Sequence, residues 1–481
     1  MVSVRPRGIY FGGAIFGLMA VWSLMTPLFS GPDEPANYIK SAAVIRGEWV
    51  GSEFPPSLQM SYWTTYVHIN PQFGTPNLIP WQFASFPDRP GYDIAIEDAP
   101  ANDVPTWTNM GRYPVLPFIF SGVATLLGPH DLSARAARLM TSFVCALLLT
   151  LAMFAMREQK KSSAGLLMTI LPGTVFLAST MNPSAIEICA AIALWSVVPI
   201  VVSGRIQGRL NIVFIISGCL LILTRPLGPA MYTIILGVSY LAAPNRLKLG
   251  PLVSKYWRLF SAHAIAITFA AWWYVTVYNF ELGAKLTDGI QSIALGSQIK
   301  EALHHIPLLL DQAVGNFGWL DAPMPRVALL AVYFAMLILI ARGLLSMPRS
   351  AILASLVLVG AIALLVVAQD INYYALLRYF GSQGRHIVPL LVGLPLIAST
   401  SFVWRRKWEI VAAISWGVTM IWAGLGALRR YTVGINGNNA MEMFRDRAWN
   451  PVLGFWPTVV LLGISTIGVV CLIPYSQTPD Q

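Results

Sequence analysis

The chain has 481 residues, of which 56% are hydrophobic and only 11% are charged, and its mean hydropathy is +0.62. This composition excludes an ordinary soluble domain and indicates a protein that crosses the membrane many times. The net charge of +10 does not indicate nucleic-acid binding, because the basic residues form short clusters between apolar runs.

The first apolar segment follows Arg5 and Arg7 and extends from Gly8 to Leu28. No small-x-small cleavage site follows it, so we interpret it as a retained signal anchor. Segments long enough to cross ~30 Å of hydrocarbon are predicted near residues 9–29, 138–156, 163–180, 184–203, 210–224, 227–243, 259–279, 326–342, 350–368, 386–403, 409–428 and 452–474. The sequence therefore predicts an all-α membrane protein, with about 12 transmembrane helices in a single integral membrane domain over residues 1–481.

Two adjacent carboxylates, Asp33 and Glu34, stand between Pro32 and Pro35 directly after the first predicted span. Each proline fixes its own φ and biases the preceding residue away from helix, so we expect a stiff, non-helical corner at the membrane surface. A carboxyl group that is partly removed from water holds a proton more readily, which suits a general base. An ordinary solvated turn is the alternative. We predict Asp33 as the catalytic base and Glu34 as the second candidate.

The run from residue 113 to residue 127 is apolar but short, and Pro114 and Pro117 interrupt it. As a membrane span, it would place the basic cluster at residues 157–161 on the outer side. We therefore interpret it as a re-entrant or surface-lying segment, which puts every later short basic loop inside. With this choice the cytoplasmic side carries 16 of the 32 Lys and Arg residues and three acidic residues, and both termini are cytoplasmic.

This topology places two long loops, residues 30–137 and 280–325, on the extracytoplasmic side. The first is rich in Pro, Trp, Tyr and Asp, and contains turn-forming sequences at residues 70–71 and 88–91. We expect it to be a folded ectodomain that lies on the membrane. The cytoplasmic loops are short, so the functional machinery is predicted to face outward.

A second polar cluster follows the ninth predicted span, where residues 378–386 read RYFGSQGRH. Arg378, Arg385 and His386 gather there at one membrane edge, together with two glycines. A guanidinium makes bidentate contacts to phosphate, and glycines let backbone N–H groups approach it closely. For Arg385 the alternative is a side chain that snorkels from a helix start. Arg225, where the fifth predicted span turns back, is a further candidate, and we predict that these residues bind a phosphate.

The loop at residues 315–323 reads GNFGWLDAP and offers Trp319 and Asp321 beside flexible glycines. This pattern fits a sugar-binding lid and an interfacial tryptophan belt equally well. His304 and His305 are adjacent, so they cannot share one helical face, and no acid or Cys motif completes a zinc site. The two carboxylates after the first span could hold Mg²⁺ or Mn²⁺, although no spacing requires a metal. Walker, GxSxG and HExxH motifs are absent from the sequence, so nucleotide hydrolysis, serine-elbow acyl transfer and zinc proteolysis have no support.

Six short motifs follow one another along nearly the whole chain: GPDEPA at 31–36, RYP at 112–114, ARL at 137–139, MNPSA at 181–185, GWLD at 318–321 and GRHIVP at 384–389. Their order and placement resemble those of a bacterial membrane-protein family of unknown function that is related to the GT-C glycosyltransferases. The chain departs from that pattern at Asn37, where a histidine is expected, and at His386, where tyrosine is more frequent.

The resemblance implies a GT-C-like helix bundle in the bacterial plasma membrane, with a catalytic acid and juxtamembrane helices on the first outer loop. It further implies a polyprenyl-phosphate sugar as donor, and an envelope glycan, glycolipid or protein as acceptor. The segment at residues 113–127 resembles the juxtamembrane helix of that family. Arg112, in the RYP motif, joins Trp319 and Asp321 as a predicted substrate-binding residue.

The functional hypothesis is inverting glycosyl transfer, in which Asp33 takes a proton from the acceptor hydroxyl and Arg385 stabilises the leaving phosphate. A transporter or flippase of lipid-linked sugars is the first alternative, and a noncatalytic envelope-assembly partner is the second. The sequence shows no internal repeat, and its polar residues cluster outside rather than at mid-membrane, which weighs against transport.

Overall fold

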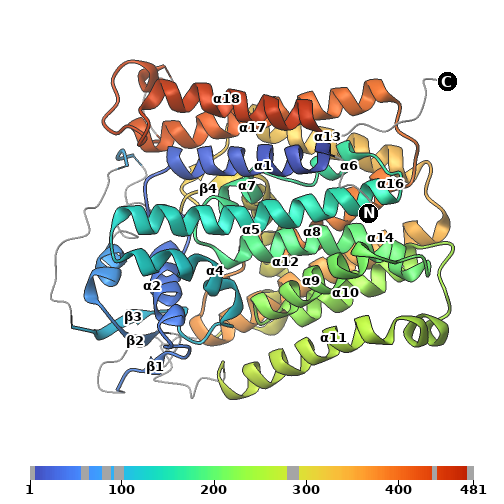
Figure 1. Ribbon diagram of the computed structural model, residues 1–481, viewed down its shortest axis with the longest axis horizontal. Coiled ribbons are helices and arrows are strands. Elements are labelled where there is room, and N and C mark those ends of the chain that lie inside the picture. The colour runs from blue at the N-terminus through green and yellow to red at the C-terminus, as the bar shows by residue number, and fades with distance from the viewer. Residues whose placement is uncertain are drawn as a thin grey trace.

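The computed structural model describes residues 6–55, 64–78, 88–91, 102–278, 292–435 and 441–473, and most of these are helical (Figure 1). In this part of the chain eight helices are long and apolar enough to cross a membrane. They are α1 (Pro6–Met25), α5 (Asp131–Glu158), α8 (Pro183–Val202), α11 (Leu249–Thr276), α13 (Arg326–Leu344), α14 (Arg349–Leu377), α17 (Arg406–Val433) and α18 (Phe455–Leu472). The predicted class, an all-α membrane protein, is confirmed.

The other predicted spans are shorter or broken. α9 (Arg209–Thr224) and α10 (Gly228–Ala242) have 16 and 15 residues. The span predicted at 163–180 is two buried helices, α6 (Ser163–Leu167) and α7 (Pro172–Ala178). The span predicted at 386–403 divides into α15 (Gly384–Leu391) and α16 (Gly393–Thr400). Proline explains both breaks, because Pro172 starts a new helix and Pro395 has no N–H to donate to the carbonyl four residues earlier.

Helix α8 lies at the centre of the bundle, and 94% of its most apolar window is buried inside the protein. Figure 1 shows α8 beside α5, with α1, α17 and α18 on one side of this pair and α9, α10 and α11 on the other. The centre of α8 carries small side chains, including Ala190, Ala191 and Ala193, and all three are fully buried. Small residues let neighbouring helices approach closely where lipid supplies no hydrophobic driving force.

The described part of the first long loop is folded and lies at one end of the bundle (Figure 1). It contains α2 (Glu34–Ile45), η2 (Pro71–Leu78), α4 (Leu116–Ala124) and η3 (Thr125–Leu127). Strands β1 (Ser52–Glu53), β2 (Thr65–Ile69) and β3 (Val104–Thr108) form an antiparallel sheet in that order. The apolar run at 113–127 is α4 with η3, and it packs against α2 and α5.

The second long loop is also structured where the structure describes it. Helix α12 (Leu295–Gly315) packs against α14 and α15, and is followed by a two-stranded ribbon of β4 (Asn316–Phe317) and β5 (Ala322–Pro323). A short helix, η4 (Glu442–Phe444), precedes α18. The described part of the loop predicted at 280–325 is therefore largely a helix that supports the bundle.

A buried lysine fixes α2 against the rest of the first loop. Lys40 is fully buried, and its Nζ donates hydrogen bonds to the carbonyl oxygens of Trp49 at 2.5 Å and Gly111 at 2.6 Å. Burial lowers the pKa of Lys40 to about 7, while the charge of Glu48 acts in the opposite direction. Thr108 adds a bond from its Oγ1 to the Ala36 carbonyl at 3.0 Å. These contacts hold α2, and with it the carboxylate corner, in one position.

Candidate functional site

The corner after α1 separates its two carboxylates. Asp33 has a left-handed backbone (φ 58°, ψ 13°) and stands at the N-cap of α2, whereas Glu34 is already the first helical residue. Pro35 fits in the first turn because an N–H there has no partner within the helix. The expected non-helical corner therefore ends at Asp33, and the two side chains enter different surroundings.

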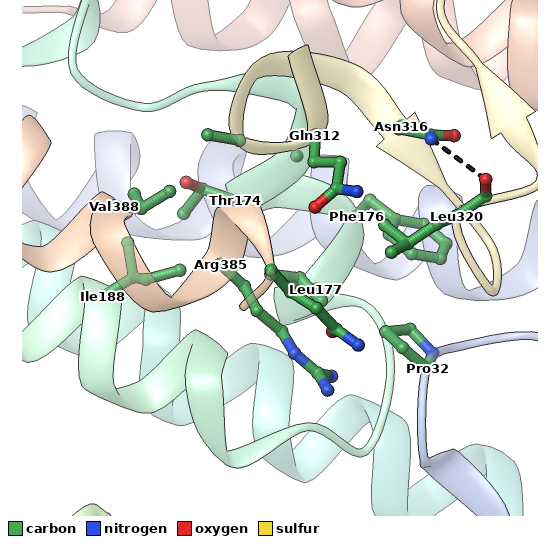
Figure 2. A pocket seen from close by; sticks show the side chains of 13 residues that line it. Pro32, Thr174, Phe176, Leu177, Ile188, Gln312, Asn316, Leu320, Arg385 and Val388 are labelled. Carbon is green, nitrogen blue, oxygen red and sulfur yellow. Dashed lines mark hydrogen bonds between the residues drawn. The ribbon is translucent and has the colours of Figure 1, made fainter. Parts of the chain in front are cut away.

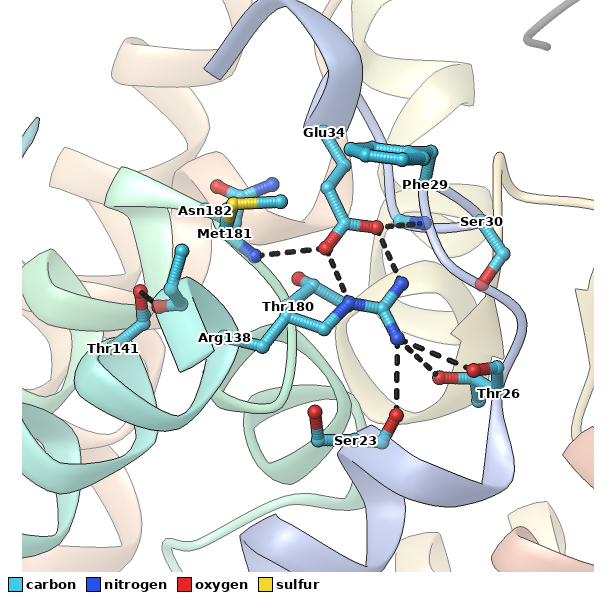
Figure 3. A network of polar contacts seen from close by, with 12 residues as sticks. Ser23, Thr26, Phe29, Ser30, Glu34, Arg138, Thr141, Thr180, Met181 and Asn182 are labelled. Atoms are coloured by element: carbon cyan, nitrogen blue, oxygen red, sulfur yellow. Dashed lines mark hydrogen bonds and ion pairs between the residues drawn. The ribbon is translucent and has the colours of Figure 1, made fainter. Parts of the chain in front are cut away.

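Glu34 is fully buried in a closed ion pair with Arg138 of α5 (Figure 3). The guanidinium binds it in a bidentate fashion, with Nε to Oε1 and Nη2 to Oε2 both at 2.6 Å. The backbone N–H groups of Gly31 and Met181 donate to the same carboxylate at 3.0 and 3.1 Å. With four donors around it and no exposed surface, Glu34 has no oxygen turned toward a substrate.

Arg138 uses its remaining N–H groups to bind the end of α1. It donates to the carbonyl oxygens of Ser23 at 3.0 Å, Thr26 at 3.2 Å and Pro27 at 2.7 Å. Figure 3 shows the arginine between the end of α1 and the turn that carries Met181. Breaking such a buried, fully bonded pair from one side costs about 3–5 kcal/mol. We therefore assign Glu34 and Arg138 to the structure of the corner.

Asp33 faces a cavity of about 200 Å³ at the same end of the bundle. Its Oδ2 forms an ion pair with Nη2 of Arg385 at 2.5 Å, and the two side chains are 22% and 11% exposed. Both residues line the cavity, as does Tyr379. Burial raises the pKa of Tyr379, and the charge of Asp33 adds to that shift, so this phenol remains protonated. The cavity thus holds a carboxylate next to a guanidinium, with access to its interior.

Two more sequence-predicted residues, Arg225 and His386, line this cavity. Arg225 follows α9 in an extended conformation, as expected for a residue before proline. Its Nη1 donates to Ser184 Oγ at 2.9 Å and lies 3.6 Å from Glu187 Oε2. Its Nη2 lies 3.3 Å from Nε2 of His386. The structure therefore brings Asp33, Arg225, Arg385 and His386 together in one cavity.

The start of α15 is held in place by α12 and α14. The N–H of Gly384 donates to Gln312 Oε1 at 2.8 Å, and a Cβ at this position would lie only 2.4 Å from the Leu309 carbonyl oxygen. Asp370 accepts from the N–H of Ser382 at 2.9 Å with one oxygen, and its other oxygen lies 3.0 Å from His305 Nδ1. Gly384 is thus required for close packing on α12, which is a different reason from the predicted approach to phosphate.

Arg378 and Arg112 do not belong to the described cavity wall. Arg378 ends α14 in a left-handed conformation (φ 59°), and its Nη1 contacts the carbonyl of Tyr374 at 3.4 Å. Arg112 forms an ion pair with Glu53 of β1. Its carbonyl accepts a 3.0 Å bond from the indole N–H of Trp273. Phosphate binding by Arg378 and substrate binding by Arg112 therefore remain predictions.

Trp319 and Asp321 lie in the turn between β4 and β5, and neither is among the described residues that line the cavity. Asp321 pairs with Nη2 of Arg430 at 2.7 Å, and both side chains are nearly inaccessible. Burial raises the pKa of Asp321, and the charge of Arg430 opposes that shift. The indole N–H of Trp319 donates to the Phe29 carbonyl at 3.3 Å. Their predicted role in substrate binding gains no support from this geometry.

A metal remains an open prediction. Among the described residues, no group of three His, Cys, Asp or Glu side chains is arranged to hold one. Asp33 is the one acid among the residues described in the cavity wall, because Glu34 is turned into its own ion pair. A Mg²⁺ or Mn²⁺ ion at Asp33 would need water and substrate phosphate as its other ligands, which is the usual arrangement for Mg²⁺.

A second, much smaller cavity of about 20 Å³ lies between α7, α12 and α15, and Arg385 lines it as well (Figure 2). Its walls are mainly apolar and include Phe176, Leu177 and Val388. A space of this size holds about one water molecule. It excludes a sugar or a lipid headgroup, so the larger polar cavity is the candidate site.

Sequence reasoning missed Arg138 and the amide side chains of the cavity. A signal for Arg138 was present, since a lone arginine at the start of the span predicted at 138–156 requires a buried partner. Asn37 was noted only as a departure from a family pattern. Asn109 and Asn182 also line the cavity. Asn182 was noted only as part of the MNPSA motif, and Asn109 carries no sequence signal of its own.

The sequence matches the family described as "Predicted membrane protein (DUF2142)" over residues 16–394. A search of curated proteins finds no match. Among solved structures, ArnT from Cupriavidus metallidurans bound to undecaprenyl phosphate has a TM-score of 0.44 and 12% identity, covering 98% of this chain and 77% of that one. Its apo form has a TM-score of 0.44 and 13% identity, with coverages of 94% and 74%. The family match spans most of the chain, so the chain belongs to the DUF2142 family, as the order of the motifs predicted.

Proposed function

We propose that this member of the DUF2142 family is a glycosyltransferase that moves a sugar from a polyprenyl-phosphate donor to an acceptor hydroxyl with inversion. The observation that carries the proposal is the cavity in which Asp33 lies beside Arg385, with Arg225 in the same wall. This reaction needs a proton acceptor on one side of the sugar and stabilisation of an anion on the other. One carboxylate and two guanidinium groups supply both.

Asp33 is the proposed base. As the acceptor oxygen forms its bond to the anomeric carbon, Asp33 takes the hydroxyl proton, and the bond between that carbon and the phosphate oxygen breaks. The electron pair leaves with the phosphate, which remains attached to the polyprenyl chain. A phosphate leaves without an acid catalyst, so one carboxylate is sufficient, unlike the pair that glycosidases require. Glu34 is unsuited to this role because four donors already surround its carboxylate.

Arg385 and Arg225 are the proposed phosphate ligands. A guanidinium binds two phosphate oxygens at once, and this contact strengthens as negative charge develops on the leaving group. In the described part of the chain, Nε of Arg385 is buried and has no hydrogen-bond partner, so this donor is free for an anion. Arg385 also stands in the first turn of α15, where the partial positive charge of the helix favours a phosphate.

The proposed site belongs on the extracytoplasmic face of a bacterial plasma membrane. Two lining residues lie at the ends of helices, Arg225 after α9 and Tyr373 in α14. Two others, Ser184 and Arg385, lie at the starts of α8 and α15. The charge pattern of the loops predicts all four helix ends to be outside. A donor with its phosphate at that membrane surface would meet an envelope glycan, glycolipid or protein as acceptor.

The test uses the full-length protein in proteoliposomes with a labelled decaprenyl-phosphate hexose and a bacterial envelope fraction as acceptor. Covalent transfer of label is the expected result, and Asp33→Asn should slow it by about 10²-fold or more. Asp103→Asn, an exposed acid outside the cavity wall, is the matched control and should transfer normally. Movement of the donor across the bilayer without transfer would support a flippase instead. If the protein neither transfers the label nor moves the donor, the proposal is contradicted.

A further inference from the structure

Asn37 is buried in the cavity wall, and its side chain has no hydrogen-bond partner among the described residues. It lies one turn after Asp33 on α2, where its backbone N–H donates to the Asp33 carbonyl at 2.9 Å. Its side chain lines the same cavity, and the residue is only 1% exposed. Within the described residues, neither Oδ1 nor Nδ2 of this side chain has a partner. A buried carboxamide with neither its donor nor its acceptor satisfied is costly, so it indicates a missing ligand.

A second amide in the same wall has a similar deficit. Oδ1 of Asn109 is buried and unpartnered in the part of the chain that the structure describes. Asn182 gives the contrast, because its Nδ2 donates to the Pro32 carbonyl and its Oδ1 accepts from the Ser184 N–H, both at 2.9 Å. The wall thus contains one amide that holds the protein together, while Asn37 and Asn109 keep hydrogen-bonding capacity for something else.

We propose that Asn37 and Asn109 form the sugar subsite of this cavity and select an uncharged, polyhydroxylated ring. This proposal rests on the proposed function, and it names the class of sugar that the donor carries. A carboxamide donates and accepts at once, so it matches a hydroxyl, which does the same. A site built from such groups discriminates strongly against a ligand that leaves them unpaired.

The charges of the cavity disfavour a charged sugar. Arg225 and Arg385 outnumber Asp33, the one acid among the described lining residues, so an ammonium group on the ring would meet a net positive charge. A ring carboxylate would compete with the phosphate for Arg385 and Arg225. The described wall also contains four tyrosines, which add hydroxyl groups and no formal charge: Tyr113, Tyr278, Tyr373 and Tyr379.

The test measures dissociation constants of the full-length protein in lipid nanodiscs for four probes. These are decaprenyl phosphate alone and decaprenyl phosphate carrying a neutral hexose, a hexosamine or a hexuronic acid. For the natural sequence we expect the neutral hexose to tighten binding by about tenfold over the bare phosphate, which corresponds to about 1.4 kcal/mol. The two charged sugars should give little or no gain.

Two variants of Asn37 sharpen this test. Asn37→Leu keeps the size and removes both hydrogen-bonding groups, so it should lose the tenfold gain from the hexose while binding of the bare phosphate stays unchanged. Asn37→Asp adds an acid next to the ring and should shift the preference toward the hexosamine. Unchanged binding of the bare phosphate also shows that Asn37→Leu is folded, so its lost gain cannot come from unfolding.

The outcomes separate the two proposals. If decaprenyl phosphate does not bind at all, the proposed function fails and the subsite fails with it. If it binds but the hexose adds nothing, only the subsite is wrong. The subsite is also overturned if Asn37→Leu weakens all four probes equally, or if the natural sequence prefers a charged sugar.

Discussion

Asp33 and Glu34 are neighbours in the sequence, and each is paired with an arginine, yet their surroundings differ. The Glu34–Arg138 pair has no exposed surface, and its carboxylate receives two additional backbone N–H bonds. The Asp33–Arg385 pair opens onto the large cavity, and Asp33 is 22% exposed. The first pair joins the first residue of α2 to α5, whereas the second joins the N-cap of α2 to the start of α15.

The two ion pairs thus differ in the number of hydrogen-bonding sites that remain open to a ligand. A carboxylate with all its lone pairs occupied stabilises the fold and cannot also accept a proton from a substrate. Asp33 and Arg385 each keep hydrogen-bonding capacity directed at the cavity. A ligand in the cavity can supply the hydrogen bonds that the protein leaves unmade. Five expected results test whether the two ion pairs differ in this way.

Glu34→Gln should give the largest effect, and the effect should be on stability. It leaves Arg138 charged and buried without a counterion, so we expect a loss of about 3–5 kcal/mol in the free energy of unfolding. Denaturant titration in detergent micelles measures this. Glu53→Gln is the matched control because Glu53 belongs to a partly exposed ion pair, for which the loss should be about 0–1 kcal/mol. Equal losses in the two variants would contradict the structural assignment of Glu34.

Asp33→Asn should reduce the rate of sugar transfer and leave the stability of the fold nearly unchanged. The rate of sugar transfer should fall by about 10²-fold or more, because the amide cannot accept the proton. The unfolding midpoint should stay close to that of the natural sequence, since Asp33 is partly exposed and belongs to no closed network. Initial rates in proteoliposomes, with the denaturation curve of the same preparation, check both parts. Retained transfer would show that Asp33 is not the base.

Arg385→Lys tests the second half of the reactive pair. Lysine keeps the charge but not the two-point contact with phosphate, so we expect about a tenfold lower transfer rate. Arg378→Lys should cost less, because Arg378 lies outside the described cavity wall. A larger loss of transfer rate at Arg378 than at Arg385 would support phosphate binding by Arg378. It would contradict the assignment of the phosphate to the cavity residues.

Asn37→Leu should reduce affinity for the sugar-bearing donor by about tenfold without changing affinity for the bare lipid phosphate. This result would extend the comparison from charges to neutral groups. The Asn37 side chain has no hydrogen-bond partner among the described residues, whereas Nδ2 and Oδ1 of Asn182 in the same wall each have one. The nanodisc binding measurements described above decide it.

The smallest expected effect concerns Lys40. Burial lowers the pKa of this lysine to about 7. The unfolded chain, with a lysine pKa of about 10.4, binds more protons than the folded chain between these two values. Stability should therefore rise with pH across this window, by about 1 kcal/mol from pH 7 to pH 8. Denaturant titrations at several pH values measure the slope. Lys40→Met should remove that part of the slope, and an unchanged slope would contradict the assignment.

Much of the architecture followed from the sequence because it depends on local properties. Length and hydropathy located the helices, and the order of the six motifs indicated the family. The broken spans at 163–180 and 386–403 were missed because hydropathy counts apolar residues and does not register a missing N–H at proline.

The sequence by itself determined that this is a many-helix membrane protein, and it singled out Asp33, Arg385, Arg225 and His386 as candidates. Only the tertiary structure decided that Asp33 faces a cavity while Glu34 is enclosed, because the partner of Glu34 lies 104 positions away. It likewise decided that Trp319, Asp321, Arg378 and Arg112 lie outside the described cavity wall. The physical reason is that charge and hydropathy are properties of single residues, whereas satisfaction of a buried polar group depends on atoms that packing brings from distant segments.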